Sequence, residues 1–155
     1  MDIKLSKNLS LEEVIESNTA TKRGIDNNPT DEHLNALKQL AINIFQPLRD
    51  YVNSPIRVNS GYRSEELNSI IGGSKTSQHC KGEAIDIKIV SNEFTNADLF
   101  NYIKNHLDFD QLIWEFGTDA SPRWVHVSYV DEYENRGQVL QAVKVNGKTQ
   151  YIKLL

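Results

Sequence analysis

Residues 84–90 read Ala-Ile-Asp-Ile-Lys-Ile-Val, a stretch in which polar and apolar side chains alternate. A period of two is typical of a β-strand, because successive side chains point to opposite faces of the sheet. The isoleucines then share one face, and Asp86 lies on the other with Ala84 and Lys88. Burying a carboxylate in so apolar a strand is costly unless a cation or hydrogen bonds compensate it. The stretch therefore predicts a strand with one apolar face and an opposite face that carries a candidate functional group.

Helical patterns precede this strand. The longest begins at Thr30 or Asp31, either of which is a suitable N-terminal cap, and its apolar residues recur at helical spacing as far as Leu48. Pro47 is expected to kink the last turn, because proline lacks the N–H that an interior helical position requires. This helix is expected to cover one face of a sheet. Shorter helices are predicted over residues 9–18, 64–71 and 96–106, the first of them opened by the capping-box pair Ser10 and Glu13.

Strand patterns dominate the second half of the chain. Besides residues 84–90, strands are predicted over residues 56–60, 111–116 and 124–129. The dipeptide Asn146-Gly147 lies between two alternating stretches and is typical of a two-residue β-hairpin turn. Early helices followed by antiparallel strands predict an α+β fold. A length of 155 residues allows one sizeable core, so residues 1–155 are expected to form a single domain.

The composition is that of an ordinary globular protein, with 39% hydrophobic and 25% charged residues. The 21 acidic side chains outnumber the 17 basic ones, which argues against a nucleic-acid-binding protein, because such proteins usually carry a basic surface. No apolar run approaches the roughly 20 residues that span a bilayer. The N-terminal residues show no apolar segment of a secretory signal, and Cys80 is the single cysteine. Synthesis and folding in the reducing cytoplasm are therefore expected.

Two histidines have a spacing that relates them to Asp86. His79 lies in a polar, glycine-flanked loop seven residues earlier, and His126 lies in the last of the predicted strands named above, on the face opposite its valine neighbours. If the two strands are neighbours, Asp86 and His126 point to the same side of the sheet. Two imidazoles and a carboxylate leave a fourth position for water, as in catalytic zinc sites. Strand histidines are more often hydrogen-bonding partners, however, and Asp86 could pair with Lys88 or an arginine, so spacing alone leaves these alternatives open.

Three short motifs make the interpretation more specific. Residues 77–86 contain Ser-x-His-x-x-Gly-x-Ala-x-Asp, residues 60–63 read Ser-Gly-Tyr-Arg, and residues 124–126 read Trp-Val-His. In order and spacing they resemble elements of the zinc D-Ala-D-Ala carboxypeptidase family, which also includes phage endolysin peptidases. This resemblance covers residues 60–130. The N-terminal helices, with residues 21–28, are also similar to the bacterial and phage branch of that family.

The resemblance implies a small α+β domain with an antiparallel sheet and helices packed mainly on one side, similar to the hedgehog N-terminal domain. It implies that His79, Asp86 and His126 bind Zn²⁺ and that Arg63 lies near the metal. A guanidinium there can bind a substrate carboxylate or stabilise an oxyanion, although a salt bridge that closes the turn at Gly61 is an alternative. The implied substrate is a stem or cross-bridge peptide of peptidoglycan. The enzyme is expected to be a monomer that acts on the cell wall after release.

The general base is where the sequence departs from the family pattern. Some branches place a glutamate three residues before the last histidine, but Arg123 stands at that position here. Glu115 is the best replacement, because the bulky residues of the predicted strand 111–116 share one side and leave Glu115 on the other. The missing glutamate also leaves open a catalytically weak or inactive zinc-containing module that binds cell-wall peptides. The choices between carboxypeptidase and endopeptidase, and between a phage and a host role, stay open as well.

Overall fold

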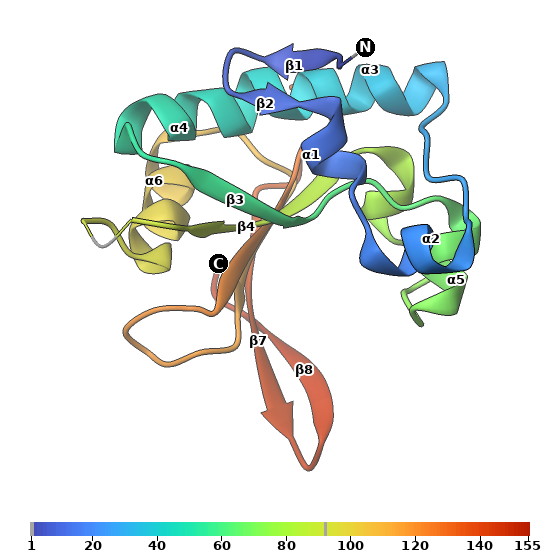
Figure 1. Ribbon diagram of the computed structural model, residues 1–155. Coiled ribbons are helices and arrows are strands. Elements are labelled where there is room, and N and C mark those ends of the chain that lie inside the picture. Colours follow the sequence, from blue (N-terminus) through green and yellow to red (C-terminus); the bar gives the residue numbers. More distant parts are fainter. Residues whose placement is uncertain (1, 92) are drawn as a thin grey trace.

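The computed structural model describes residues 2–91 and 93–155 (Figure 1). Helices predominate in the first half and strands in the second, which confirms the α+β prediction. None of the helices described is long and apolar enough to cross a membrane. The elements occur in the order β1 (Lys4–Ser6), β2 (Leu9–Ser10), α1 (Leu11–Ile15), α2 (Asn18–Arg23), α3 (Asp31–Leu40), η1 (Ala41–Phe45), α4 (Gln46–Val52), β3 (Ile56–Ser60), α5 (Glu65–Ile70), η2 (Gln78–Lys81), β4 (Ala84–Ile89), α6 (Asn96–His106), β5 (Gln111–Glu115), β6 (Trp124–Ser128), β7 (Gln138–Val145) and β8 (Lys148–Lys153).

A six-stranded sheet forms the centre of the fold, with the strand order β3-β4-β6-β5-β7-β8. Its neighbouring strands are antiparallel, except that β5 and β7 run parallel. The sheet is therefore mixed, whereas the sequence predicts antiparallel strands. The parallel pair arises because β6 ends beside the start of β5. The chain then enters β7 next to the first residue of β5, so both strands run in the same direction. The sequence patterns also do not predict the small sheet that β1 forms with β2.

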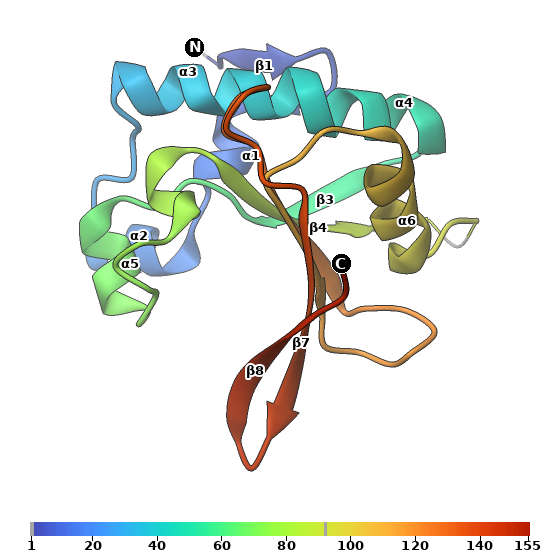
Figure 2. The same ribbon diagram turned by 180° about the vertical axis from the view of Figure 1, so that it is seen from behind.

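Helices cover one face of the large sheet (Figures 1 and 2). The continuous helix of α3, η1 and α4 shares a hydrophobic core with α6 and with alternate residues of the central strands. Full burial of a valine, leucine or isoleucine side chain stabilises a fold by about 1.5–3 kcal/mol, so this hydrophobic layer supplies much of the stability. The strand residues of this core are fully buried: Ile85, Ile87, Leu112, Val125 and Val127.

The long helix changes its hydrogen-bonding pattern before Pro47. Thr30 caps the start of the helix through its hydroxyl group, as predicted. Over Ala41–Phe45 the turn widens to a π-helix, and the N–H of Gln46 donates to the carbonyl of Ala41. Proline has no N–H, and its ring clashes with the carbonyl four residues earlier in an ordinary helix. A wider turn accommodates it, so the expected distortion lies just ahead of the proline.

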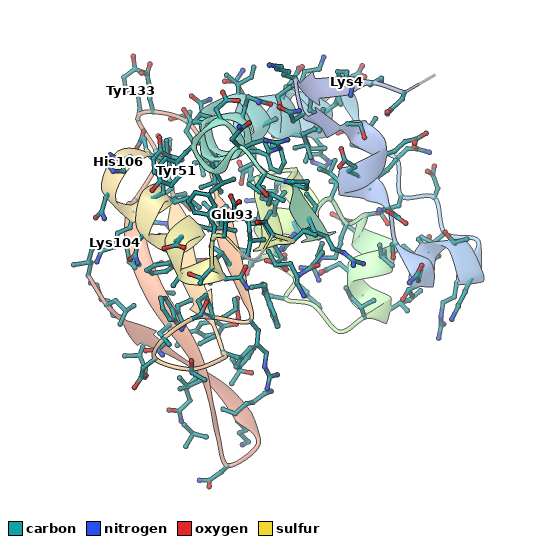
Figure 3. The ribbon with its side chains drawn as sticks, turned by 60° about the vertical axis from the view of Figure 1, so that its left-hand side comes forward. Lys4, Tyr51, Glu93, Lys104, His106 and Tyr133 are labelled. Carbon is teal, nitrogen blue, oxygen red and sulfur yellow. The ribbon has the colours of Figure 1, made fainter. Side chains whose placement is uncertain are left out.

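Aromatic side chains join α4 to α6. The rings of Tyr51 and Tyr102 are stacked with their centroids 4.0 Å apart, and Tyr102 also contacts His106 near the end of α6. Figure 3 labels Tyr51 and His106, the two outer residues of this group. Such pairs contribute about 0.5–1.5 kcal/mol beyond the burial of their area. His106 is therefore a packing residue at the surface of α6.

The β7–β8 hairpin extends beyond the other strands (Figure 1). Its turn residues, Asn146 and Gly147, have φ values of 51° and 78°. Positive φ at both positions is what a type I′ turn requires, and this confirms the predicted hairpin. β8 is the edge strand, and lysines at both of its ends, Lys148 and Lys153, hinder pairing with another strand.

Candidate active site

Three neighbouring strands bring predicted site residues onto the face of the sheet that the long helix and α6 leave open. In the antiparallel pairing, Asp86 of β4 lies opposite His126 of β6, and His126 lies opposite Ile113 of β5. Glu115 is two residues further along β5 than Ile113 and therefore points to the same side. The strands of Asp86 and His126 are thus neighbours, which is the condition that the sequence analysis sets for a shared site.

His79 reaches the same face from η2, the short helix before β4. Ser77 caps this helix by accepting a hydrogen bond from the N–H of His79, and Gly82 ends it with a φ of 74°. A Cβ atom on Gly82 would clash with the carbonyl of His33, so glycine also lets η2 approach the long helix. Nδ1 of His79 lies 2.7 Å from the carbonyl oxygen of Gly61. Nδ1 must carry the proton to donate there, which leaves Nε2 free to bind a metal ion.

The three candidate ligands meet in an arrangement that suits a metal ion. Oδ2 of Asp86 lies 3.5 Å from Nε2 of His79, and Oδ1 lies 2.9 Å from Nδ1 of His126. One ligand atom from each residue lies within 4.8 Å of the other two. A tetrahedral ion with bonds of about 2.0–2.2 Å separates its ligand atoms by roughly 3.4 Å, so the cluster fits with small side-chain shifts. Within the described residues Asp86 pairs with the two imidazoles and with no lysine or arginine.

The two carboxyl groups of this face differ in their electrostatics. Burial raises the pKa of Asp86, but the nearby imidazoles of His79 and His126 more than offset this, and the pKa lies well below its ordinary value. Burial raises the pKa of Glu115 to about 7; His126 opposes this rise and the charge of Asp86 adds to it. Asp86 is therefore suited to remain an anionic ligand, whereas Glu115 can accept and release a proton near neutral pH.

Arg123 has the sequence position of the missing glutamate, but its side chain does not lie at the metal cluster. It lies in the loop between β5 and β6, where its backbone N–H donates to the carbonyl of Glu115. Its side chain lines a separate pocket together with Val143 of β7. Glu115, only 8% exposed, supplies the carboxyl group on the metal-binding face instead. Glu115 thus lies on the same sheet face as Asp86 and His126, as the alternation of its strand predicts.

Arg63 enters the site from the turn after β3. A Cβ atom on Gly61 would clash with the backbone of Val14, so glycine lets this turn pass close to α1. The guanidinium of Arg63 donates to Oγ of Ser77 at 3.3 Å, and its backbone N–H donates to the carbonyl of His79 at 3.1 Å. Nε is buried without a hydrogen-bond partner, and no carboxylate of the described residues forms an ion pair with Arg63. The guanidinium therefore retains donors for a ligand.

All five predicted site residues line one open groove with a volume of about 1330 Å³. The β7–β8 hairpin forms the far wall of this groove, and no sequence pattern predicts this. Alternation of side chains predicts which hairpin residues share a face, but not that this face adjoins the metal cluster. The hairpin residues that line the groove are Gln138, Leu140, Lys144, Thr149 and Tyr151.

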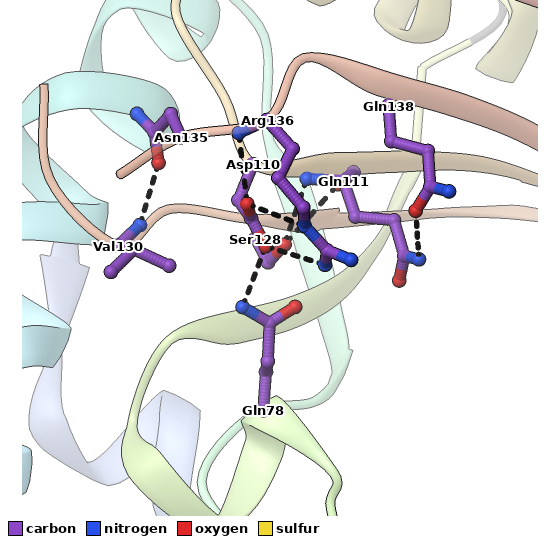
Figure 4. A network of polar contacts seen from close by, with 8 residues as sticks. All are labelled: Gln78, Asp110, Gln111, Ser128, Val130, Asn135, Arg136 and Gln138. Atoms are coloured by element: carbon purple, nitrogen blue, oxygen red, sulfur yellow. Dashed lines mark hydrogen bonds and ion pairs between the residues drawn. The ribbon is translucent and has the colours of Figure 1, made fainter. Parts of the chain in front are cut away.

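An ion pair between a buried aspartate and an exposed arginine lies at another part of the groove (Figure 4). Asp110, 2% exposed, accepts hydrogen bonds from Nε and Nη2 of Arg136 at 2.9 and 2.8 Å and from Nε2 of Gln78 at 2.9 Å. Burial raises the pKa of Asp110, but these hydrogen bonds hold it below its ordinary value. Because Gln78 directly precedes His79, the network ties the ligand-bearing turn to the start of β5. Sequence reasoning missed these residues, because no motif relates positions so far apart in the chain.

A model of the peptidase M15 family matches residues 7–128. This segment is more than half of the chain and contains all five predicted site residues. The chain belongs to the peptidase M15 family. Membership supports a hydrolase of the metallopeptidase type, in agreement with the cluster of His79, Asp86 and His126. No curated protein matches the sequence. The matched segment ends before the β7–β8 hairpin begins.

Proposed function

We propose that this member of the peptidase M15 family is a zinc-dependent peptidase that hydrolyses peptide bonds of bacterial peptidoglycan. The observation that carries the proposal is the position of Glu115 on the same face as the cluster of His79, Asp86 and His126. Hydrolysis of an amide needs an electrophilic centre and a group that transfers a proton, and a metal ion bound by this cluster would share the sheet face with Glu115.

The donor set suits zinc. His79 would bind through Nε2, His126 through Nδ1 and Asp86 through a carboxylate oxygen, which leaves the fourth tetrahedral position open. When bound, zinc polarises the scissile carbonyl and lowers the pKa of water towards about 7. The hydrogen bond from Nδ1 of His79 to Gly61 holds the ring in the orientation that presents Nε2.

Glu115 is the proposed general base. Burial raises its pKa above the ordinary value, and a carboxyl group in such a setting can take a proton from the attacking water. The same carboxyl can then donate that proton to the departing amine. Asp86 is less suited to this role, because both of its oxygens face imidazoles and its pKa is lowered.

Arg63 is the proposed substrate-binding cation, since its guanidinium lines the groove and has no acidic partner among the described residues. It can bind a substrate carboxylate or the carbonyl oxygen that becomes negative. The open shape of the groove favours an endopeptidase, because a peptide can extend on both sides of the scissile bond. Action on the cell wall after release from the cytoplasm, as for a phage or prophage endolysin, belongs to the same proposal.

Digestion of purified peptidoglycan tests the proposal. The zinc-loaded protein is expected to release peptides that mass analysis identifies, and a chelator is expected to stop the release. Glu115→Gln should lower the rate by about 10²–10⁴-fold while zinc stays bound. Glu93→Gln, a change of an exposed loop carboxylate, should leave the rate unchanged. Full activity in chelator, or in the Glu115→Gln variant, would contradict the proposal.

The absence of a glutamate three residues before His126 favours a second candidate, a zinc-containing module that binds cell-wall peptides without cleaving them. This candidate predicts that the wild-type protein and Glu115→Gln bind a stem peptide equally and that neither releases fragments. Calorimetric titration of the peptide, combined with the digestion above, separates the two functions.

A further inference from the structure

The β7–β8 hairpin places a row of side chains beside the proposed general base. Ala142 of β7 lies next to Glu115 of β5 in the parallel pairing, and Tyr151 of β8 lies opposite Ala142. Paired residues of neighbouring strands point to the same face of a sheet. Glu115, Ala142 and Tyr151 therefore form one row across three strands, and Glu115 and Tyr151 both line the groove.

Tyr151 is placed to touch a peptide that lies over Glu115. Their Cα atoms are two strand spacings apart, about 10 Å, and the residue between them, Ala142, has a small side chain that is fully buried. Tyr151 is 57% exposed and so is accessible to a ligand. Burial raises the pKa of Tyr151, and the charges of Glu115 and Asp86 raise it further. Its hydroxyl group therefore stays protonated and can donate a hydrogen bond.

Lys144 adds a positive charge to the same wall. Its Nζ donates to Oγ1 of Thr149 at 3.0 Å and lies 5.6 Å from the centre of the Phe116 ring. These contacts restrict a flexible side chain at the groove, and no carboxylate in the described part of the chain forms an ion pair with it. Lys148 of the same hairpin pairs with Val145 and points to the opposite face.

We propose that the hairpin binds the substrate peptide, with Tyr151 donating a hydrogen bond to a backbone carbonyl and Lys144 binding a carboxylate further along the peptide. This inference rests on the proposed function, because it names the peptide chemistry that the same groove selects. It assigns selectivity to a segment outside the matched family region. Peptides with free carboxyl groups are then preferred over the same peptides with amidated carboxyl groups, because amidation removes the charge that Lys144 attracts.

The charge selectivity is tested by calorimetric titration of the zinc-loaded Glu115→Gln protein, which should bind without turnover. The probes are a synthetic peptidoglycan stem peptide and its fully amidated form. Lys144→Gln should weaken binding of the free-carboxyl peptide about fivefold, as expected for an exposed charge pair, and leave binding of the amidated peptide unchanged. Lys148→Gln is the matched control and should change neither. Equal losses for both peptides, or no loss for either, would overturn the role of Lys144.

The hydrogen bond is tested by Tyr151→Phe in the same titration, with Tyr133→Phe, a change of a tyrosine that is 87% exposed, as the control. Loss of one hydrogen bond should weaken binding of both peptides by roughly 2–10-fold, and the control should bind normally. Unchanged binding of Tyr151→Phe would overturn this role.

Turnover separates this inference from the proposed function. If the wild-type protein cleaves peptidoglycan but the hairpin variants behave like the controls, the inference alone fails. If the wild-type protein binds the peptide without cleaving it and the hairpin variants bind it more weakly, the peptidase proposal alone fails. If the stem peptide does not bind at all, the hairpin does not recognise this substrate and the inference is also overturned.

Discussion

The same strands build both faces of the large sheet, but one face stabilises the fold and the other carries the candidate site. In β4 and β6, Ile87 and Val125 point to the helices and are fully buried, whereas their neighbours Asp86 and His126 point to the groove. The first face gains free energy from apolar burial. The second keeps carboxyl groups and imidazoles out of water, which is costly unless they pair or bind a cation. Stability and chemistry are therefore separated by one residue step along a strand.

The largest expected effect of a change on the groove face is the loss of the metal ion. His126→Ala removes one of three ligands, so zinc affinity should fall by more than the roughly 10–100-fold typical of changes to groups that only support a ligand. Unfolding of the metal-free protein should shift less than it does for a core change, because His126→Ala removes one hydrogen-bond partner of Asp86 and no part of the helix-covered core. Metal analysis after dialysis measures the first effect, and His106→Ala is the control. Full zinc content in His126→Ala would contradict the view that the groove face serves metal binding.

A change on the helix-covered face should lower the stability and leave zinc binding intact. Ile87→Ala leaves a cavity beneath the long helix and should lower the free energy of unfolding by about 2–5 kcal/mol, as urea denaturation would measure. The folded variant should still bind one zinc ion per chain. Val90→Ala, at a position that is 61% exposed, is the control and should be nearly neutral. Loss of zinc from folded Ile87→Ala would show that the two faces are coupled.

A smaller effect is expected for the cation beside the metal cluster. Arg63→Lys keeps the charge but loses the planar fork of donors, so kcat/KM on a stem peptide should fall on the order of tenfold, with unchanged stability. Arg23→Lys, in exposed α2, should have no effect on the same kinetics. Unaltered kcat/KM for Arg63→Lys would contradict the proposed role of the Arg63 guanidinium in substrate binding.

The last prediction concerns stability alone, through the cost of burying Glu115. Its pKa is about 7 in the folded protein against an ordinary value of 4.5, so its neutral form favours folding. This contribution is complete below pH 4.5 and is lost as the pH rises through 7. In chelator, Glu115→Gln should therefore melt a few degrees higher than wild type at pH 8, and the difference should vanish near pH 4.5. Thermal scans at both pH values measure this, and a constant difference would contradict it.

Several site features could be predicted because they depend on local periodicity. The alternation around Asp86, His126 and Glu115 states which side chains share a face, and the structure bears this out. Caps and turns are equally local: Ser10 and Glu13 form the predicted capping box. The sequence motifs added Arg63, which approaches from the turn after β3, a path that no periodicity describes.

Other features depended on strand order. The parallel pairing of β5 with β7, the ion pair of Asp110 with Arg136 and the hairpin wall all join segments far apart in the chain. The alternation of side chains along one strand does not say which strands are neighbours, so it predicts none of these three features.

By itself, the sequence determined which side chains belong together on each strand face and which of them could bind a metal, since both depend on the two-residue period and on donor chemistry. Only the tertiary structure decided that β4, β6 and β5 are adjacent, that Glu115 is buried enough for a pKa near 7, and that Tyr151 lies two strands away on the same face. The physical reason is that desolvation and proximity are properties of the packed sheet, and no single strand contains them.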